Sequence, residues 1–392
     1  MIRKLTELDL HDKTVFLRVD FNVPIKDGKV GESHRIDSAL PTLRFILERA
    51  KKIIVASHLG RPDGKVIEKY SLAPVQRHLQ NSLKLPVAMA SDCIGPAVES
   101  LIRTGGGKVV LLENLRFHPE EEKNDENFSR ALAALADVYV DDAFGAAHRA
   151  HASIAGMAKF FKYKGAGLLL QKELDYLGPL LAHPAKPFVT ILGGAKVSDK
   201  IGVIRNLLPK VSALLIGGGM AYTFLKAKGI DIGRSLLEHD KIDLATELMQ
   251  QAKQLGVNLL LPVDHVAGDS ERKHPVTFDS EIPDDRMGLD IGPKTAQNFA
   301  AEIGKAKLVL WNGPVGLFEV PPYDRGSRVL AQTLADNHPA VVGIIAGGDT
   351  VAAVSAAGLG SRIAHLSTGG GATLEFLEGK ILPGIKALDD QP

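Results

Sequence analysis

The chain of 392 residues is too long for one ordinary hydrophobic core, so its length predicts two domains, with three as the outer alternative. With 45% hydrophobic residues, 24% charged residues and a formal net charge of +1, it has a globular composition and lacks the basic excess of proteins that bind nucleic acids or membrane surfaces. Its one cysteine, Cys93, excludes an internal disulfide, suits a reducing cytoplasmic compartment and is expected to be filler in the core or at the surface. The first ten residues, MIRKLTELDL, contain no continuous apolar segment, so we expect neither a secretory signal nor a membrane anchor.

The first half of the chain alternates short apolar segments with helical ones. Strands are predicted at residues 14–19, 52–56, 86–89, 109–112 and 138–140, and helices from about residue 37, at 74–83, at 96–103 and up to residue 132. Pro41 should lie near the first turn of the first helix, where its missing amide is harmless. Strands separated in this way predict right-handed crossovers and a parallel sheet covered by helices on both faces.

Residues 167–181 predict a helix with apolar positions on more than one face, followed by Pro184 and Pro187. Because the alternation of strands and helices restarts directly after it, we interpret this segment as an interdomain helix. The alternative is an ordinary last helix of the first domain. The expected division is a first domain at 1–166, an interdomain helix and hinge at 167–185, and a second domain at 186–377.

The second half follows the same plan without repeating the sequence. Strands are predicted at residues 188–192, 213–216, 258–261, 308–311 and 341–345, with helical segments between them. The charged tract 266–290, which contains Pro275, predicts a small antiparallel excursion on the surface. Trp311 is expected in the core.

The stretch VTILGGAKVSDK, residues 189–200, has the pattern of a phosphate-binding turn. Gly193 and Gly194 allow close approach of an anion, a helix is expected to start at once, and Lys196 and Lys200 bring positive charge. The alternative is a tight strand-to-helix turn of any α/β domain. The stretch fits neither the Walker pattern nor G-x-G-x-x-G, so a nucleotide site needs support from elsewhere in the chain.

Charged and polar residues follow the predicted strands of the first half. In open parallel sheets, ligands bind beyond the carboxyl ends of the strands, so these residues should converge at one edge. Arginine offers a fork of donors suited to carboxylates and phosphates, which predicts a small substrate with several negative charges. Solvated loop charges are the alternative for any one of them. The set is Asp20, Asn22, His58, Arg61, Arg116, His118, Asp141, Asp142, His148, Arg149 and His151, together with Arg35, which lies just before the first predicted helix.

Glycines follow the strands of the second half, which is how a chain cradles the phosphates of a nucleotide. Asp349 could be a helix N-cap, a Mg²⁺-phosphate contact, or both. Glu319 is placed to hold ribose hydroxyls, against the alternative of an ordinary exposed acid. The glycine turns are Gly193-Gly194, Gly217-Gly218-Gly219, Gly313 with Gly316, Gly347-Gly348 and Gly369-Gly370-Gly371.

An anion site on one domain and a nucleotide site on the other predict phosphoryl transfer across a cleft that closes about the interdomain helix. No catalytic base is required if the acceptor is a carboxylate, because a group with a pKa of about 4 is already ionised at neutral pH. Positioning and positive charge around the moving group are then what the reaction needs.

Over essentially its whole length the chain resembles the phosphoglycerate kinase family. Nine motifs in the family's order carry the resemblance, and the departures are small, at Ala146 and Gln171. The motifs are RVDFNVP, SHLGRP, LLENLRFHPEEE, DDAFGAAHRAHAS, LGGAKVSDKI, IGGGMAYTFLKA, WNGPVGLFE, GGDTVAAV and STGGGATLEFLEGKILPG.

The resemblance implies two Rossmann-like domains, with the C-terminal tail, residues 378–392, packing back on the first. It implies reversible transfer from 1,3-bisphosphoglycerate to ADP, giving 3-phosphoglycerate and ATP with Mg²⁺. A monomer is the family's usual state.

The resemblance also implies roles for individual residues. The phosphoglycerate ligands would be Asp20, Asn22, Arg35, His58, Arg61, Arg116 and Arg149. The nucleotide contacts would be Gly193, Ala195, Lys196, Lys200, Gly217, Gly218, Asn312, Glu319, Gly347, Gly348, Asp349 and Thr350, with Asp349 facing Mg²⁺. The transferring phosphoryl group would be stabilised by Arg35, Lys200 and amides near Gly348 and Gly371.

Two rival interpretations belong to other classes. An NAD-dependent dehydrogenase would need the G-x-G-x-x-G motif, which the phosphate-turn stretch does not supply. A catalytically silent nucleotide-binding protein of the same fold is disfavoured by the joint presence of Arg35, Lys200 and Asp349.

Overall fold

The computed structural model describes residues 2–105 and 107–389, which form two compact units. The first unit extends to Asp175 and resumes at Ile381, and the second comprises Tyr176–Lys380. Residues 390–392 of the expected returning tail lie outside the described part. The domain bounds expected from the sequence stay a prediction. No helix in the described ranges is both long and apolar enough to cross a membrane.

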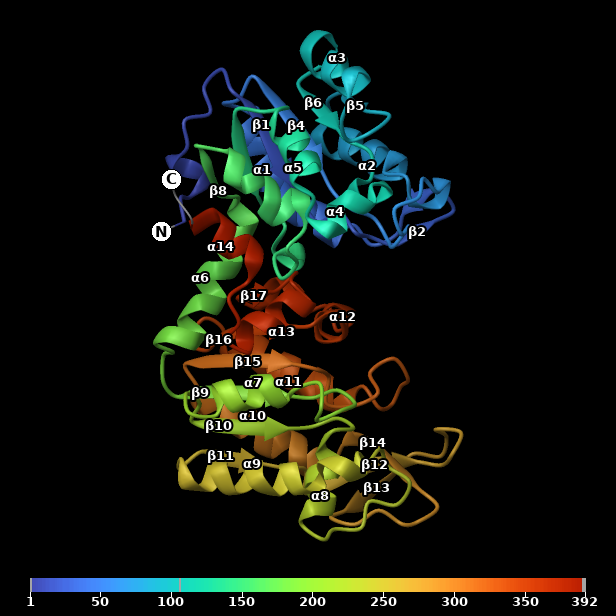
Figure 1. Cartoon of the computed structure of the whole chain (residues 1–392). Helices are drawn as coiled ribbons and strands as arrows, with labels where there is room; N and C mark the ends of the chain where they lie inside the picture. Colours follow the sequence, from blue (N-terminus) through green and yellow to red (C-terminus); the bar gives the residue numbers. More distant parts are fainter. Residues whose placement is uncertain (1, 106, 390–392) are drawn as a thin grey trace. The chain divides into compact units, whose positions relative to one another are not determined.

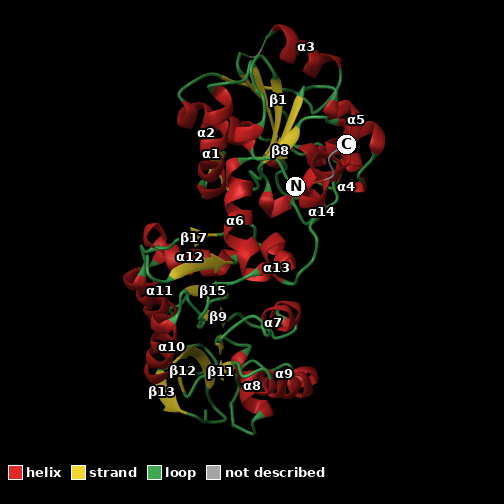
Figure 2. Cartoon of the chain, turned by 90° about the vertical axis from the view of Figure 1, so that its left-hand side faces the viewer, coloured by secondary structure: helices red, strands yellow, loops and turns green. Residues whose placement is uncertain are grey.

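The first unit is built on a six-stranded parallel sheet, with its helices on both sides (Figures 1 and 2). Its strand order is β5 (Val87–Met89), β6 (Val109–Leu111), β4 (Lys52–Ala56), β1 (Thr14–Arg18), β7 (Val138–Asp141) and β8 (Lys164–Ala166). The helices are α1 (His34–Leu47), α2 (Ala73–Leu83), α3 (Pro96–Thr104), α4 (Pro119–Lys123), α5 (Glu126–Ala133) and α14 (Pro383–Asp389).

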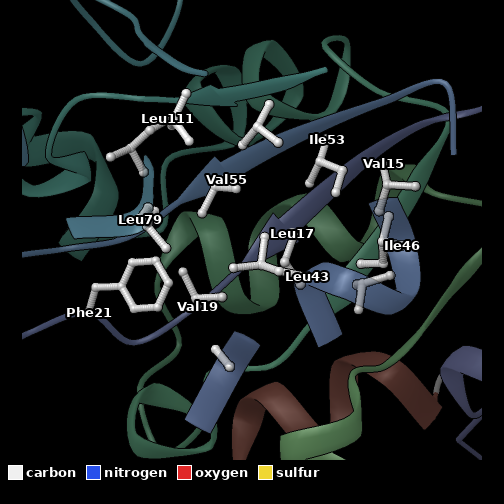
Figure 3. Close-up of a cluster of buried hydrophobic side chains, with 14 of the residues drawn as sticks. Val15, Leu17, Val19, Phe21, Leu43, Ile46, Ile53, Val55, Leu79 and Leu111 are labelled. Atoms are coloured by element: carbon white, nitrogen blue, oxygen red, sulfur yellow. The ribbon is translucent and has the colours of Figure 1, made fainter. Parts of the chain in front are cut away.

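The core of this unit follows from the alternation of side chains along β1. Val15 and Leu17 point to one face, where they pack with Leu43 of α1 and Leu79 of α2 (Figure 3). On the alternate position, the ring of Phe16 lies 6.3 Å from that of Tyr139. Because both faces are covered, the strands are almost continuously apolar, as parallel strands must be.

The second unit carries another six-stranded parallel sheet. Its order is β11 (Asn258–Leu260), β10 (Ala213–Ile216), β9 (Phe188–Leu192), β15 (Leu308–Asn312), β16 (Val342–Ala346) and β17 (His365–Leu366). Counted along the chain this is 3-2-1-4-5-6, the Rossmann order, and the order reverses between β9 and β15. The predicted α/β fold of two Rossmann-like units is therefore confirmed.

Helices and a small sheet complete the second unit. Trp311 is fully buried within its core, as expected. The helices are α7 (Ile201–Leu207), α8 (Ala221–Ala227), α9 (Ile242–Gln254), α10 (Pro293–Lys305), α11 (Arg325–Asn337), α12 (Gly348–Ala356) and α13 (Gly371–Leu377). The expected antiparallel excursion is a three-stranded sheet of β12 (Asp264–Gly268), β13 (Val276–Asp279) and β14 (Met287–Ile291).

Two local expectations are wrong, and four short strands were not predicted. Helix α1 begins three residues earlier than predicted, so Pro41 lies in the interior of the helix. Pro41 is exposed, so water can solvate the backbone carbonyl group that has no N–H partner there. No helix starts directly after Gly194, because residues 194–200 form a loop and α7 begins only after Lys200. The short strands β2 (Ile25–Lys26), β3 (Lys29–Val30), β8 and β17 have too few apolar residues to show a strand pattern.

Helix α6 (Leu168–Ala182) begins on a buried carboxylate. An Oδ1 atom of Asp142 accepts the amides of Leu169 at 2.9 Å and Leu170 at 3.0 Å, two donors that have no partner within the helix. A Cβ atom on Gly167 would lie 2.2 Å from the same oxygen, so only glycine fits there. Burial raises the pKa of Asp142 to about 7, although hydrogen bonds from Thr42 and the helix amides oppose the shift.

Asp142→Asn should therefore change how stability depends on pH. Between about pH 4 and pH 7 the folded state keeps a proton on Asp142 that the unfolded chain releases, so the wild type loses stability as pH rises through this window. The amide oxygen of asparagine still accepts the helix amides but does not ionise. We expect the variant to gain up to roughly 4 kcal/mol relative to the wild type across the window. Urea unfolding at several pH values measures this, and a pH-independent difference would contradict it.

Candidate active site

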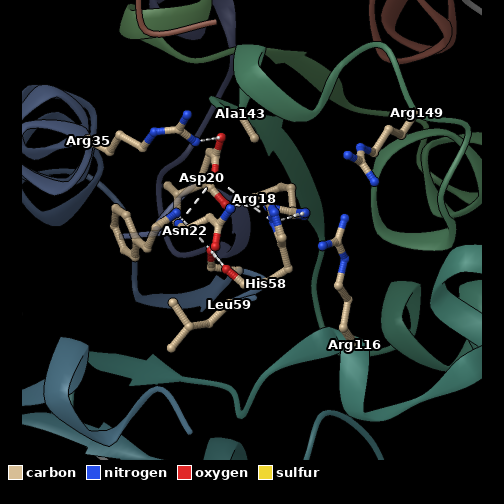
Figure 4. Close-up of polar contacts among 12 residues, drawn as sticks. Arg18, Asp20, Asn22, Arg35, His58, Leu59, Arg116, Ala143 and Arg149 are labelled. Carbon is tan, nitrogen blue, oxygen red and sulfur yellow. Dashed lines mark hydrogen bonds and ion pairs between the residues drawn. The ribbon is translucent and has the colours of Figure 1, made fainter. Parts of the chain in front are cut away.

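Part of the polar set predicted at the first sheet comes together at the carboxyl ends of its strands (Figure 4). Asp20 follows β1, His58 follows β4, and Arg149 comes after β7. Arg116 lies in a 3-10 turn, Leu115–Phe117, that follows β6. The expected convergence at one edge is what parallel strands produce.

Asp20 and Asn22 order the surroundings of this edge. Arg35, in the first turn of α1, forms an ion pair with the carboxylate of Asp20 (Figure 4). The side-chain oxygen of Asn22 accepts the amide of Gly60 at 2.9 Å, which holds the loop that carries His58. Arg61 follows on the same loop and is exposed.

Arg18, the last residue of β1, was not among the expected site residues. It is only 1% exposed, and its guanidinium donates to Ser153 Oγ at 2.7 Å and to the carbonyl of Val19. Its Nη2 atom lies 3.3 Å from His58 Nδ1. The signal in the sequence was an arginine in the otherwise apolar strand TVFLRV, where a charge needs a buried partner.

The hydroxyl group of Ser153 links Arg18 to the buried carboxylate of Glu121. Ser153 accepts from Arg18 and donates to the carboxylate of Glu121 at 2.6 Å, and its amide donates to the other carboxylate oxygen at 2.9 Å. Burial raises the pKa of Glu121, whereas the charge of Arg18 and the bonds from Ser153 lower it. The carboxylate of Glu121 thus lies opposite the buried positive charge of Arg18, with the hydroxyl group of Ser153 between them.

Positive charge remains in excess at this edge. The guanidinium groups of Arg116 and Arg149 face one another (Figure 4), and burial together with the charge of Arg149 lowers the pKa of Arg116. Arg116 also donates to the carbonyl of Gly60 at 2.7 Å and pairs with Glu122 at 3.1 Å. Burial and four arginines hold the pKa of His58 well below its usual range, so His58 is neutral here. The arrangement favours a bound anion.

Not every polar residue of the predicted set belongs to this cluster. His118 turns to Asp92, with Nε2 2.6 Å from the carboxylate, and its ring stacks on Phe128. Asp142 begins α6, as described above. His151 lies 3.8 Å from Glu121, and burial and nearby arginines lower its pKa to about 3. These side chains support the fold around the anion cluster.

The second unit contains a cavity of about 330 Å³. Its size is that of a small-molecule pocket. Of the expected nucleotide residues, Ala195, Gly218, Glu319 and Asp349 line it. Its other lining residues are Gly194, Gly219, Tyr222, Arg234, Leu236, Arg272, Met287, Gly288, Leu289, Asp290, Pro314, Val315, Gly316 and Leu317.

The pocket lies where the strand order reverses, because the turns after β9 and β15 touch. A Cβ atom on Gly193 would stand 2.2 Å from the carbonyl oxygen of Pro314, and one on Gly313 would stand 2.3 Å from that of Gly193. A Cβ atom on Gly217 would meet Val315 at 2.7 Å. Gly193 and Gly217 therefore allow the turns to pack and do not line the cavity themselves.

Lys200 and Lys196 differ in their surroundings. Lys200 donates to the side-chain oxygen of Asn312 and is partly buried, and burial lowers its pKa while the charges of Asp199 and Asp349 oppose this. Lys196 is exposed. Thr350 is fully buried and accepts the amide of Gly313 at 2.7 Å, so it secures the turn.

Asp349 is the second residue of α12, which opens with Gly348. Gly347 is the N-cap, with φ of 89° that suits only glycine, so the N-cap interpretation of Asp349 is wrong. The carboxylate is exposed and lines the pocket. Mg²⁺ usually takes one or two carboxylates together with substrate phosphates, and this donor fits that requirement. Gly371 opens α13, where Gly370 has φ of 53°.

Asp290 is a pocket residue that the sequence did not reveal. Its carboxylate accepts the amides of Gly326 at 2.8 Å and Ile291 at 2.9 Å. Burial raises its pKa to about 8. A Cβ atom on Gly316 would lie 2.1 Å from Asp290 Oδ1, so this acid leaves no room for a side chain at position 316.

An arginine-rich sheet edge on one Rossmann-like unit and a glycine-turn pocket with a carboxylate on the other define a small-molecule phosphotransferase. A family model described as "Phosphoglycerate kinase" matches residues 5–380. The chain belongs to the phosphoglycerate kinase family, and it is a glycolytic kinase that transfers a phosphoryl group to or from a carboxyl group.

Individual relatives agree along the whole chain. The phosphoglycerate kinase of Anaeromyxobacter dehalogenans (strain 2CP-C) is 54% identical over 396 residues, which cover 99% of this chain and 100% of the relative. The solved structure of phosphoglycerate kinase from Coxiella burnetii has a TM-score of 0.90 at 40% identity and covers 100% of both chains. That from Pyrococcus horikoshii OT3 has a TM-score of 0.81 at 31% identity, covering 99% of this chain and 98% of its own.

Gly193→Ala should disturb the pocket, because the added methyl group forces the turn away from Pro314. We expect a loss of about 1–3 kcal/mol in stability, as for overpacking, together with weaker nucleotide binding. Gly304→Ala is the matched control, since that glycine lies inside α10 with no atom within 4 Å of the new Cβ. It should gain up to about 1 kcal/mol from helix propensity. Thermal unfolding and calorimetric titration with ADP compare them; identical behaviour would contradict the packing argument.

Proposed function

We propose that the arginine cluster of the first unit binds 3-phosphoglycerate or 1,3-bisphosphoglycerate, and that the pocket of the second unit binds ADP or ATP. The observation that carries the proposal is the excess of positive charge around neutral His58. With Arg35, Arg116 and Arg149 directed to this edge, a ligand with a phosphate and a carboxylate compensates the charge better than a monoanion.

The remaining residues would bind the smaller groups of the substrate. Asp20 and Asn22 offer acceptors and a donor for a hydroxyl group, and His58 offers a neutral ring nitrogen. Arg61, exposed on the adjoining loop, is available to a phosphate. Arg18 is buried, contacts His58 and does not touch substrate in this proposal.

The nucleotide would lie along the glycine turns. Glu319 would accept from the ribose hydroxyls, and Lys196, exposed beside Ala195, would contact the phosphates. Asp349 would hold Mg²⁺ together with the nucleotide phosphates. The bound metal neutralises phosphate charge. Asn312 would keep Lys200 in position, because its oxygen accepts from that lysine.

In the direction of ATP synthesis, a terminal phosphate oxygen of ADP attacks the acyl-phosphate phosphorus, and the bond from phosphorus to the carboxylate oxygen breaks. Arg35 and Lys200 would stabilise the transferring group, aided by amides near Gly348 and Gly371. The leaving carboxylate needs no proton at neutral pH, so no residue acts as a general base.

The proposal also includes the domain bounds, the oligomeric state and the cellular location expected from the sequence. Residues 1–166, 167–185 and 186–377 keep their predicted roles, with closure about the second segment. We propose a cytoplasmic monomer that acts on small molecules and not on nucleic acid or membranes.

Arg35→Ala tests the transfer step. We expect kcat to fall about 100-fold or more while the affinity for ADP survives, because a donor aimed at the transferring group is lost. Arg35→Lys should be intermediate, since it keeps the charge but not the fork. Arg44→Ala, farther along α1, is the control. A coupled assay of ATP-dependent phosphorylation of 3-phosphoglycerate gives the rates, and near-normal turnover of Arg35→Ala would remove Arg35 from this role.

Asp349→Asn tests the metal position. Losing the carboxylate should raise the Mg²⁺ concentration that gives half-maximal rate by about tenfold or more. Asp243→Asn, which removes an exposed first-turn carboxylate from α9, serves as control. The same assay over a Mg²⁺ series measures the shift. If both variants show the wild-type Mg²⁺ dependence, Asp349 does not hold the metal.

A further inference from the structure

A second cavity in the second unit, of about 670 Å³, is larger than the nucleotide pocket and shares no residue with it. We call it the β11 groove, because it runs along that edge strand between the ends of α8 and α9 and the side of α10. Its lining residues are Leu225, Lys228, Ile230, Met249, Ala252, Lys253, Val257, Asn258, Leu259, Leu260, Leu261, Pro262, Val263, Ser280 and Asn298.

The floor of the β11 groove is apolar and reaches solvent. Leu259, Leu260 and Leu261 are partly exposed, as are Ile230 and Met249. Val263 is 47% exposed, which makes it one of the most exposed large apolar residues described. A continuous apolar surface of this kind is unfavourable in water and is often a ligand site.

The charges of the β11 groove have one sign. Lys228 and Lys253 line it, and among the described residues that line it there is no acid. Within residues 2–105 and 107–389, neither lysine appears in an ion pair, whereas nearby Lys226 pairs with Asp231 at 3.1 Å and Lys294 with Asp279 at 2.7 Å. Both groove lysines lie at helix ends, Lys228 as the C-cap of α8 and Lys253 in the last turn of α9.

The edge strand itself is a poor template for a peptide. β11 has only three residues, and Pro262 lies two residues beyond its end without an N–H group. A short edge with a proline disfavours addition of a further strand. The groove therefore suits a ligand that has an apolar chain and one negative charge but no peptide backbone.

We propose that the β11 groove binds an aliphatic monocarboxylate, with the hydrocarbon chain on the leucine floor and the carboxylate at Lys228 and Lys253. The contacts required are apolar burial along the chain and two charge-assisted hydrogen bonds at its head. The site is independent of the kinase reaction, because none of the residues assigned to substrates lines it.

Calorimetric titration of the full chain with decanoate, below its micelle concentration, tests the site. We expect saturable binding at one site, binding of decanol at least tenfold weaker, and no effect of saturating ATP on decanoate affinity. Lys228→Gln/Lys253→Gln should lose at least tenfold in affinity, whereas Lys26→Gln/Lys29→Gln, two exposed lysines of the β2–β3 hairpin, should not.

A second pair of variants guards against indirect effects. Asn298→Trp places a large ring in the groove from an exposed position and should abolish binding; Gln297→Trp changes its exposed neighbour, which does not line the groove, and should bind normally. Kinase activity should stay unchanged in all of them. Absence of saturable binding, equal losses in the paired variants, competition by ATP, or binding of an acidic peptide instead of decanoate would each overturn the proposal.

Discussion

The first unit depends on the burial of two opposite charges, Arg18 and Glu121, bridged by the hydroxyl group of Ser153. Either charge alone in that position would be strongly unfavourable, so the three groups hold one another in place. Arg18 then contacts His58, and its charge helps to keep that ring neutral. The buried network therefore reaches the polar edge of the sheet through the contact between Arg18 and His58.

In the second unit, the turns at the end of the sheet pack backbone against backbone. Where β9 and β15 end, the turns approach so closely that a methyl group on Gly193 or Gly313 would overlap backbone atoms. The reversal of strand order at this point opens a crevice. The amides of Gly193 and Gly194 donate to the carbonyls of Asn312 and Pro314, which holds the turns together. Charged side chains also lie near this point, among them Lys200, which is held by Asn312, and Asp349 on α12.

Much of this organisation could be predicted, because buried strands are apolar segments with clear ends. β4 and β9 agree residue for residue with the expected strands. Strand order and the roles of Arg18 and Asp290 could not be predicted, since each depends on a partner distant in the sequence, such as Ser153 or Gly326. The loop after Gly194 differs from the predicted helix start because Gly, Lys and Asp are common in both.

The chain has one tryptophan, Trp311, so its intrinsic tryptophan fluorescence comes from a single known position. The indole N–H of Trp311 donates to the carbonyl of Gly313 at 2.7 Å, and the amide of Gly313 donates to Thr350, so the chromophore is hydrogen-bonded into the turn after β15. Its emission describes the second unit alone. If a ligand that binds the first unit changes the fluorescence of Trp311, that change would therefore report, without an added label, the coupling between the two units.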